Sequence, residues 1–99
     1  MTLLQAGPVA VVAVVGALDL TQVPRVRVAL EEALDGRPAQ VVVDLADCDF
    51  VDANALSMLL EAHRSAARRG GVVTLRGCSP RVLRLLSLTG LAGVFDLAG

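Results

Sequence analysis

The residues that could carry chemistry in this 99-residue sequence are few and widely separated. A triad hydrolase needs a nucleophile, a base and an acid that orients the base. The only histidine is His63, and Ser57 lies six positions before it on one predicted helix, so the two side chains are roughly 120° apart around the helix axis. They cannot form a dyad. We expect no catalytic residue, and we expect His63 to lie at the edge of the helix's apolar face.

A second candidate is the acidic cluster of Asp44, Asp47, Asp49 and Asp52, whose carboxylates could hold a hard cation. Its spacing matches no EF-hand loop, and the two cysteines, 48 and 78, form no CxxC pattern. We expect no metal, a solvated loop in which Asp52 caps a helix, and two free thiols. A small enzyme or ligand-binding domain that uses this loop with a metal is the minor alternative.

Composition excludes several classes of partner. Nine arginines nearly balance ten acidic residues, and only two residues are aromatic, which is unlike a nucleic-acid-binding surface. The longest apolar stretch, Pro8 to Leu18, is about half the roughly 20 residues of a membrane-spanning helix. No P-loop pattern is present and the start lacks a basic signal region. We expect a cytoplasmic protein without a cofactor, nucleic acid or direct membrane insertion.

These residues must be positioned by alternating strands and helices. Strands are predicted at 8–15, 40–45 and 72–75. The first of these is expected to end at Gly16 and to pair with an edge strand at 2–5 across an Ala6-Gly7 turn. Helices are predicted at Val23–Leu34, at Ala53–Arg69, and from Ser79-Pro80 to Leu88. Residues 91–99 fit either a short strand or a half-turn of helix.

The second predicted helix presents one apolar face, made of Leu56, Leu59, Leu60, His63 and Ala67. The fold class is therefore α/β, with a mostly parallel mixed sheet of four to five strands, an N-terminal hairpin and helices packed on the sheet. Length indicates a single domain over residues 1–99. An exposed Ala/Val-rich edge strand could pair two copies into a homodimer.

Several landmarks occur in one order along the chain. They are Gly16-Ala17-Leu18-Asp19, Val41-Val42-Val43-Asp44-Leu45, Phe50-Val51-Asp52-Ala53-Asn54-Ala55-Leu56, Gly70-Gly71, Cys78-Ser79-Pro80 and Leu88-Thr89-Gly90-Leu91. With these landmarks the sequence resembles the STAS family, the fold of anti-sigma factor antagonists, over nearly its whole length. The third landmark is similar to the family's Phe-x-Asp-Ser-Ser-Gly-Leu motif.

The resemblance implies a non-enzymatic partner-switching module. In the family, a kinase-type anti-sigma factor phosphorylates the second serine of Ser-Ser, and the unmodified form binds that kinase and frees a sigma factor. Here the motif departs at Ala53, Asn54 and Ala55, so the phosphosite position is Asn54, which has no hydroxyl to phosphorylate. The resemblance assigns partner binding to a surface made of Asp19, Asp52, Ala53, Asn54, Ala55, Ser57 and Met58.

The leading hypothesis is therefore an anti-sigma factor antagonist that binds a kinase-type anti-sigma factor or a related signalling protein and cannot be switched by phosphate at Asn54. The alternative is a STAS subunit of an ABC-type lipid transport system, which would bind the transporter ATPase and need no phosphoserine. The genes beside this one distinguish the two hypotheses.

Overall fold

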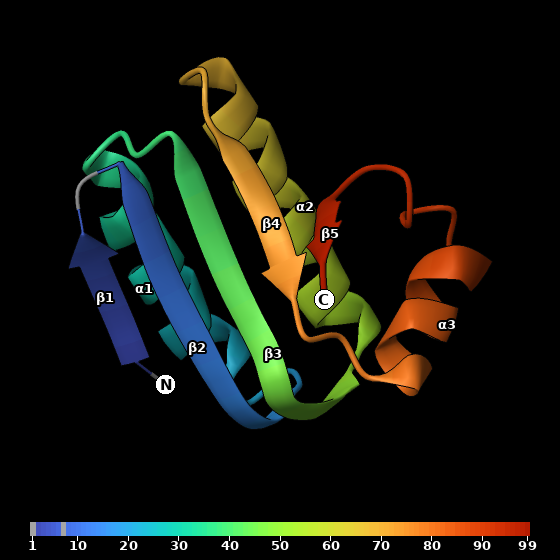
Figure 1. Cartoon of the computed structure of the whole chain (residues 1–99). Coiled ribbons are helices and arrows are strands. Elements are labelled where there is room, and N and C mark those ends of the chain that lie inside the picture. The colour runs from blue at the N-terminus through green and yellow to red at the C-terminus, as the bar shows by residue number, and fades with distance from the viewer. Residues whose placement is uncertain (1, 7) are drawn as a thin grey trace.

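The computed structural model describes the backbone of residues 2–6 and 8–99, and side chains from residue 8 onward. The elements, in chain order, are β1 Thr2–Ala6, β2 Val9–Leu18, α1 Val23–Asp35, β3 Gln40–Val51, α2 Ala53–Arg68, β4 Val72–Arg76, α3 Pro80–Leu88 and β5 Asp96–Ala98 (Figure 1). This order confirms the predicted hairpin, helices and internal strands. The predicted turn at Ala6-Gly7 includes Gly7, which lies outside the described residues.

The five strands form one sheet in the order β1-β2-β3-β4-β5. β1 is antiparallel to β2, and every later pairing is parallel. Because crossovers between parallel strands are right-handed, three successive crossovers in one direction place all three helices on the same face. In Figure 1, α1 and α2 lie behind the sheet and α3 lies beside the β5 edge. The predicted α/β class and mixed sheet are confirmed, and the opposite sheet face has no helix on it.

One hydrophobic core lies between the helices and the sheet. Its strand residues alternate along β2, with Ala10, Val12 and Val14 buried and Val9, Val11 and Ala13 half-buried. The valine-rich stretch Pro8 to Leu18 is typical of a buried strand, and that expectation is wrong for one face, because helices cover only one face of the sheet. Val42 is also buried, but it lies outside the core cluster.

The strands β2 and β3 run past their neighbours. β1 pairs with β2 only over Val9–Ala13, and β4 pairs with β3 only over Gln40–Asp44, whereas β2 and β3 stay paired to Leu18 and Val51. We call residues 15–18 and 47–51 the β2–β3 extension. Two predictions fail here: residue 16 does not end the strand, and residues 46–49 belong to β3 and form no loop.

Backbone geometry explains the first of these corrections. The β2–β3 register shifts on both sides of Val15, and Gly16 has a φ of +82°, so the chain passes through an irregular stretch and continues as a strand. A positive φ is easily adopted only by glycine. Gly16 therefore permits the strand to bend where the sequence suggested that it stops.

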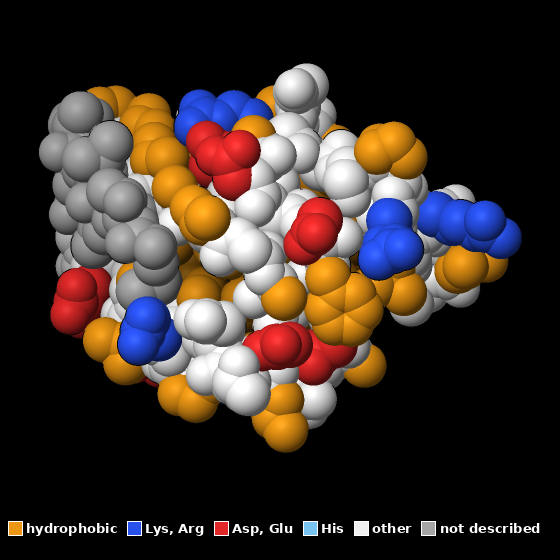
Figure 2. All heavy atoms as spheres, turned by 90° about the horizontal axis from the view of Figure 1, so that it is seen from below, with side chains coloured by type: hydrophobic (Ala, Val, Ile, Leu, Met, Phe, Trp, Pro, Cys, Tyr) orange, Lys and Arg blue, Asp and Glu red, His pale blue; other side chains and the backbone are white. Residues whose placement is uncertain are grey.

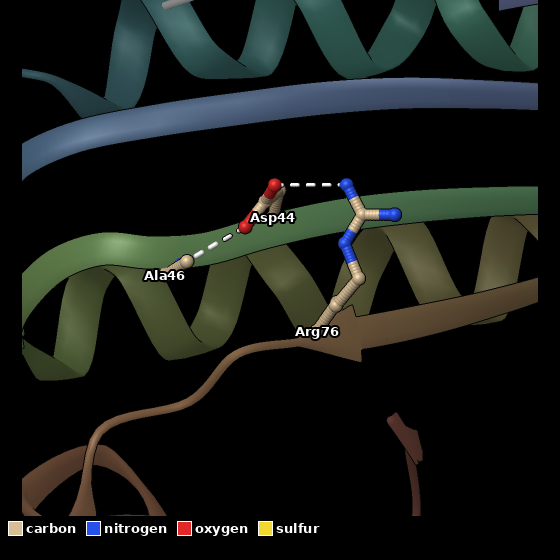
Figure 3. Close-up of polar contacts among 3 residues, drawn as sticks. All are labelled: Asp44, Ala46 and Arg76. Carbon is tan, nitrogen blue, oxygen red and sulfur yellow. Dashed lines mark hydrogen bonds and ion pairs between the residues drawn. The ribbon is translucent and has the colours of Figure 1, made fainter. Parts of the chain in front are cut away.

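Polar contacts on the open face tie β3, β4 and β5 together. The Gln40 side chain donates to the Thr74 hydroxyl at 2.8 Å, and that hydroxyl donates to Asp96 at 2.7 Å. Nearer the carboxyl ends, one Asp44 oxygen accepts from Arg76 at 2.8 Å and the other from the Ala46 N–H at 3.0 Å (Figure 3). The Arg76 hydrogen bond is the main reason that the pKa of Asp44 lies below 3.8.

The buried face of α2 is wider than predicted and turned toward α1. Its buried residues are Ala55, Leu56, Met58, Leu59, Ala62 and Ala66, whereas Ala67 is exposed. The predicted face assumed contact with the sheet alone, but α2 also packs against α1. The prediction for His63 is confirmed: its side chain is half-buried, and its ring packs edge-on against the Phe95 ring with 5.7 Å between the ring centroids.

The C-terminal segment combines both predicted alternatives. A turn follows α3 around Ala92–Val94, and β5 then pairs with the outer side of β4. Among the described residues, none of the helices has the length and apolar character needed to cross a membrane.

Candidate partner-binding edge

The predicted site residues lie where β2 and β3 end. Parallel pairing joins Leu18 to Val51, and the Asp52 N–H donates to the Leu18 carbonyl at 3.2 Å. The β2–α1 loop and the first turn of α2 are therefore neighbours, although more than thirty residues separate them. We call residues 19–22 and 52–54 the binding edge; Figure 2 views the molecule from that side.

Asp52 joins the two halves of the binding edge. One carboxylate oxygen accepts from the Ala55 N–H at 2.8 Å, which makes Asp52 the N-cap of α2, as predicted. The other oxygen accepts from the Leu20 N–H at 3.0 Å, across the gap between the loops. Nothing in the sequence indicated this second bond. Asp52 uses both oxygens within the protein, so its first role is to position the edge.

Asp19 shapes the β2–α1 loop. Its Oδ1 accepts from both the N–H and the hydroxyl of Thr21, at 3.0 and 2.6 Å. Its carbonyl accepts from the N–H groups of Gln22 and Val23, which begins the turn into α1. The Thr21 hydroxyl is the main cause that lowers the pKa of Asp19, so this carboxylate stays charged at neutral pH.

The first residues of α2 face solvent. Ala53, Asn54 and Ser57 are all exposed, with Ser57 one turn beyond the edge. Within the described part of the chain, the Asn54 amide makes no hydrogen bond to another residue. Asp52, and not Asn54, is the N-cap of α2. Asn54 instead presents a free, uncharged amide at the edge.

Two predicted contact residues are buried. Ala55 is 0% exposed and Met58 is 2% exposed, so neither can offer its side chain to a partner. Ala55 faces the core directly behind the cap. The prediction put Met58 on the outer side of α2 because it did not include contact with α1. In the structure α1 and α2 form a groove between them, and Met58 lines its floor together with Leu30, Leu34 and Ala62. Both side chains are removed from the proposed contact surface.

The aspartates of the acidic cluster have separate positions. Asp44 pairs with Arg76, Asp52 caps α2, and Asp47 and Asp49 are exposed on β3. In the part of the chain that the structure describes, no three His, Cys, Asp or Glu side chains gather as metal ligands would. The geometry therefore gives no support to the metal-binding alternative.

The two cysteines are free, as predicted. Cys48 belongs to the β2–β3 extension and its side chain is buried, with the thiol sulfur 3.4 Å from the Phe50 carbonyl oxygen; Cys78 is half-buried. Burial raises the pKa of both thiols, which keeps them protonated and unreactive at neutral pH.

The sequence reasoning missed the exposed apolar side chains beside the edge. Val15 is 65% exposed, Leu20 63% and Phe50 41%. The sequence contained one usable signal: Leu20 is an apolar residue between Asp19 and Thr21 in a predicted loop. Val15 gave no signal because it belongs to a valine run that is predicted as a strand, and Phe50 follows the predicted acidic loop, where nothing in the sequence indicates which way its side chain points.

Known proteins resemble this chain in sequence and in fold. A protein family described as "Mlab, STAS domain" matches residues 1–98. The anti-sigma F factor antagonist of Paenibacillus polymyxa is 30% identical over 90 residues, which cover 90% of this chain and 77% of that protein. The anti-sigma-B factor antagonist of Listeria monocytogenes is 29% identical over 84 residues, covering 85% and 74%.

Solved structures agree with the sequence comparisons. The crystal structure of an anti-sigma factor antagonist from Mycobacterium paratuberculosis superposes with a TM-score of 0.86 at 25% identity, covering 98% of this chain and 82% of that one. The family match extends over nearly the whole chain, and the five-stranded sheet with helices on one face is the fold that the resemblance implied. This chain is a member of the STAS domain family, in which its named relatives are anti-sigma factor antagonists.

Proposed function

We propose that this chain is a single-domain, cytoplasmic, non-enzymatic binding protein that docks its binding edge on a kinase-type anti-sigma factor and is not switched off by phosphate. Its relatives are named as anti-sigma factor antagonists, which supports an anti-sigma factor as the partner. The observation that carries the proposal is Asn54: it stands at the motif's phosphosite position, exposed in the first turn of α2.

The consequence is electrostatic. A phosphoserine at this position would add roughly two negative charges next to the Asp52 carboxylate and near Asp19. Those charges would repel the Asp52 and Asp19 carboxylates and would alter the hydrogen bonds from Asp52 that position the loop. Asn54 carries no charge and accepts no phosphoryl group, so the edge keeps one electrostatic state.

The test uses a purified kinase-type anti-sigma factor from the source organism. The wild-type chain should bind it, and incubation with ATP should leave the intact mass of the chain unchanged. Asn54→Ser should regain phosphorylation, and Asn54→Asp should weaken binding. Ser57→Ala is the matched control, because Ser57 is the next exposed hydroxyl on α2 and its loss should change neither result.

Two outcomes would contradict the proposal. One is an added phosphate on the wild-type chain that disappears in Ser57→Ala, because the switch would then have moved along the helix. The other is the absence of any binding to the anti-sigma factor.

A second partner class has support from one observation. The matching family is described as "Mlab, STAS domain", which does not restrict its members to anti-sigma factors. The alternative is a subunit that binds the ATPase of an ABC-type lipid transport system through the same edge. Purification with that ATPase, and an operon that contains its permease gene, would favour it over an anti-sigma partner.

A further inference from the structure

We infer that Leu20 in the binding edge and Phe50 in the adjoining β2–β3 extension make the main contact with the partner, and that the partner offers these two side chains an apolar pocket surrounded by basic side chains. This inference rests on the proposed function and names the chemistry of the surface that the edge recognises. It moves the centre of the contact from α2 to the β2–β3 extension and the adjoining loop.

The first step is the direction of Phe50. Phe50 is paired in register with Ala17, and the next residues on the two strands, Leu18 and Val51, are both buried in the core. Since neighbouring side chains of a strand point to opposite faces, Phe50 points away from the core. It is one of only two aromatic residues in the chain, and the other, Phe95, is buried.

The second step is the rigidity of the surroundings. Leu20 is held by the bond from its N–H to Asp52, two residues after Phe50. Beyond Asp44 and Ala13 no described strand pairs with the outer sides of the extension, so its side chains are open to a partner. Large apolar side chains on a rigid frame lose little conformational entropy on binding, and aromatic residues dominate protein interfaces for this reason.

The third step is charge. Residues 14–22 and 45–60 contain four aspartates, at 19, 47, 49 and 52, and no lysine or arginine, whereas the whole chain has a net charge of only −1. Asp47 and Asp49 flank the buried Cys48 on the extension and are exposed. Figure 2 shows acidic and hydrophobic side chains next to one another across the middle of this view, with basic side chains around them at the right, at the top and at the lower left.

An apolar contact inside an acidic border selects a partner of opposite charge. Acidic side chains at the rim of an interface speed association with a basic surface and disfavour acidic ones, while the buried apolar centre sets the lifetime of the complex. The partner surface must therefore combine an apolar pocket with arginine or lysine around it.

The test measures binding of the purified kinase-type anti-sigma factor by surface plasmon resonance. Leu20→Gln/Phe50→Gln should raise the Kd by roughly tenfold or more, mainly through faster dissociation. Asp47→Lys/Asp49→Lys should slow association, and the difference from wild type should shrink at high salt. Circular dichroism should show that each variant remains folded.

Matched controls lie on the helical layer. Val28 on α1 is an exposed apolar residue, and Glu31 and Glu32 on α1 are exposed acids. Val28→Gln and Glu31→Lys/Glu32→Lys should bind like wild type. If Leu20→Gln/Phe50→Gln binds as tightly as wild type while Asn54→Asp does not bind, this inference is overturned and the proposed function stands. No wild-type binding would overturn both.

Discussion

Replacement of Asp52 should destabilise the fold in two separable parts. Asp52→Ala removes the N-cap of α2, which costs about 1 kcal/mol, and the bond to the Leu20 N–H, which is exposed and contributes about 1 kcal/mol. The free energy of unfolding should fall by about 2 kcal/mol. For a domain of this size the melting temperature should then drop by roughly 10 °C.

Serine at this position separates the two contributions. Its single hydroxyl can cap α2, but it provides no second oxygen to reach Leu20, so Asp52→Ser should lose about 1 kcal/mol. Urea and thermal unfolding measure the stability. Hydrogen exchange of the Leu20 amide reports the lost bond directly, and that amide should exchange faster in both variants.

Asp49→Ala is the matched control, because Asp49 is exposed on the neighbouring strand and caps no helix. It should change the unfolding free energy by less than about 0.5 kcal/mol. The reasoning is refuted if Asp52→Ser is as stable as wild type and its Leu20 amide stays protected. It is also refuted if Asp52→Ala keeps full stability but loses partner binding, since Asp52 would then contact the partner directly.

Three further predictions concern the rest of the molecule. Arg76→Gln should lower the free energy of unfolding by about 0.5 kcal/mol at pH 7. Because the Arg76 hydrogen bond lowers the pKa of Asp44 in the folded protein, this difference from wild type should vanish when Asp44 becomes protonated at lower pH. A difference that does not change with pH would argue against the ion pair. Gly77→Ala should lower the free energy of unfolding, measured in urea, by about 1 to 3 kcal/mol, because φ is +72° at this residue and the new Cβ would lie 2.9 Å from the Ala46 Cα. Unchanged stability would contradict that geometry. Iodoacetamide should alkylate Cys48 at pH 7 roughly tenfold faster in urea than in buffer, as mass spectrometry can show, and equal rates would contradict its burial.

Local chemistry explains which features the sequence could predict. Asp52 was recognised as a cap because capping depends on residues within one turn, and Ser79 with Pro80 marked the start of α3 for the same reason. The strands and helices followed from runs of valine and from helical spacing. These signals depend only on near neighbours in the chain.

The failures all involve contacts between distant residues. The bond from Asp52 to Leu20 spans 32 positions and exists only because β2 and β3 are paired in register. Met58 is buried by α1, a helix whose position relative to α2 no local pattern specifies. The outward direction of Phe50 was not predicted, since the sequence does not show that residues 46–51 continue β3 or that only one face of the sheet is covered.

The order of the strands in the sheet also bears on how the chain folds. Each strand lies beside the strand that precedes it in the sequence. No later strand therefore has to be inserted between two strands that are already paired. During synthesis the hairpin of β1 and β2 can form first, and each strand that follows can add to the growing edge with its crossover helix. The pairing of β2 with β3, which brings the two halves of the binding edge together, therefore does not depend on β5 being inserted between them.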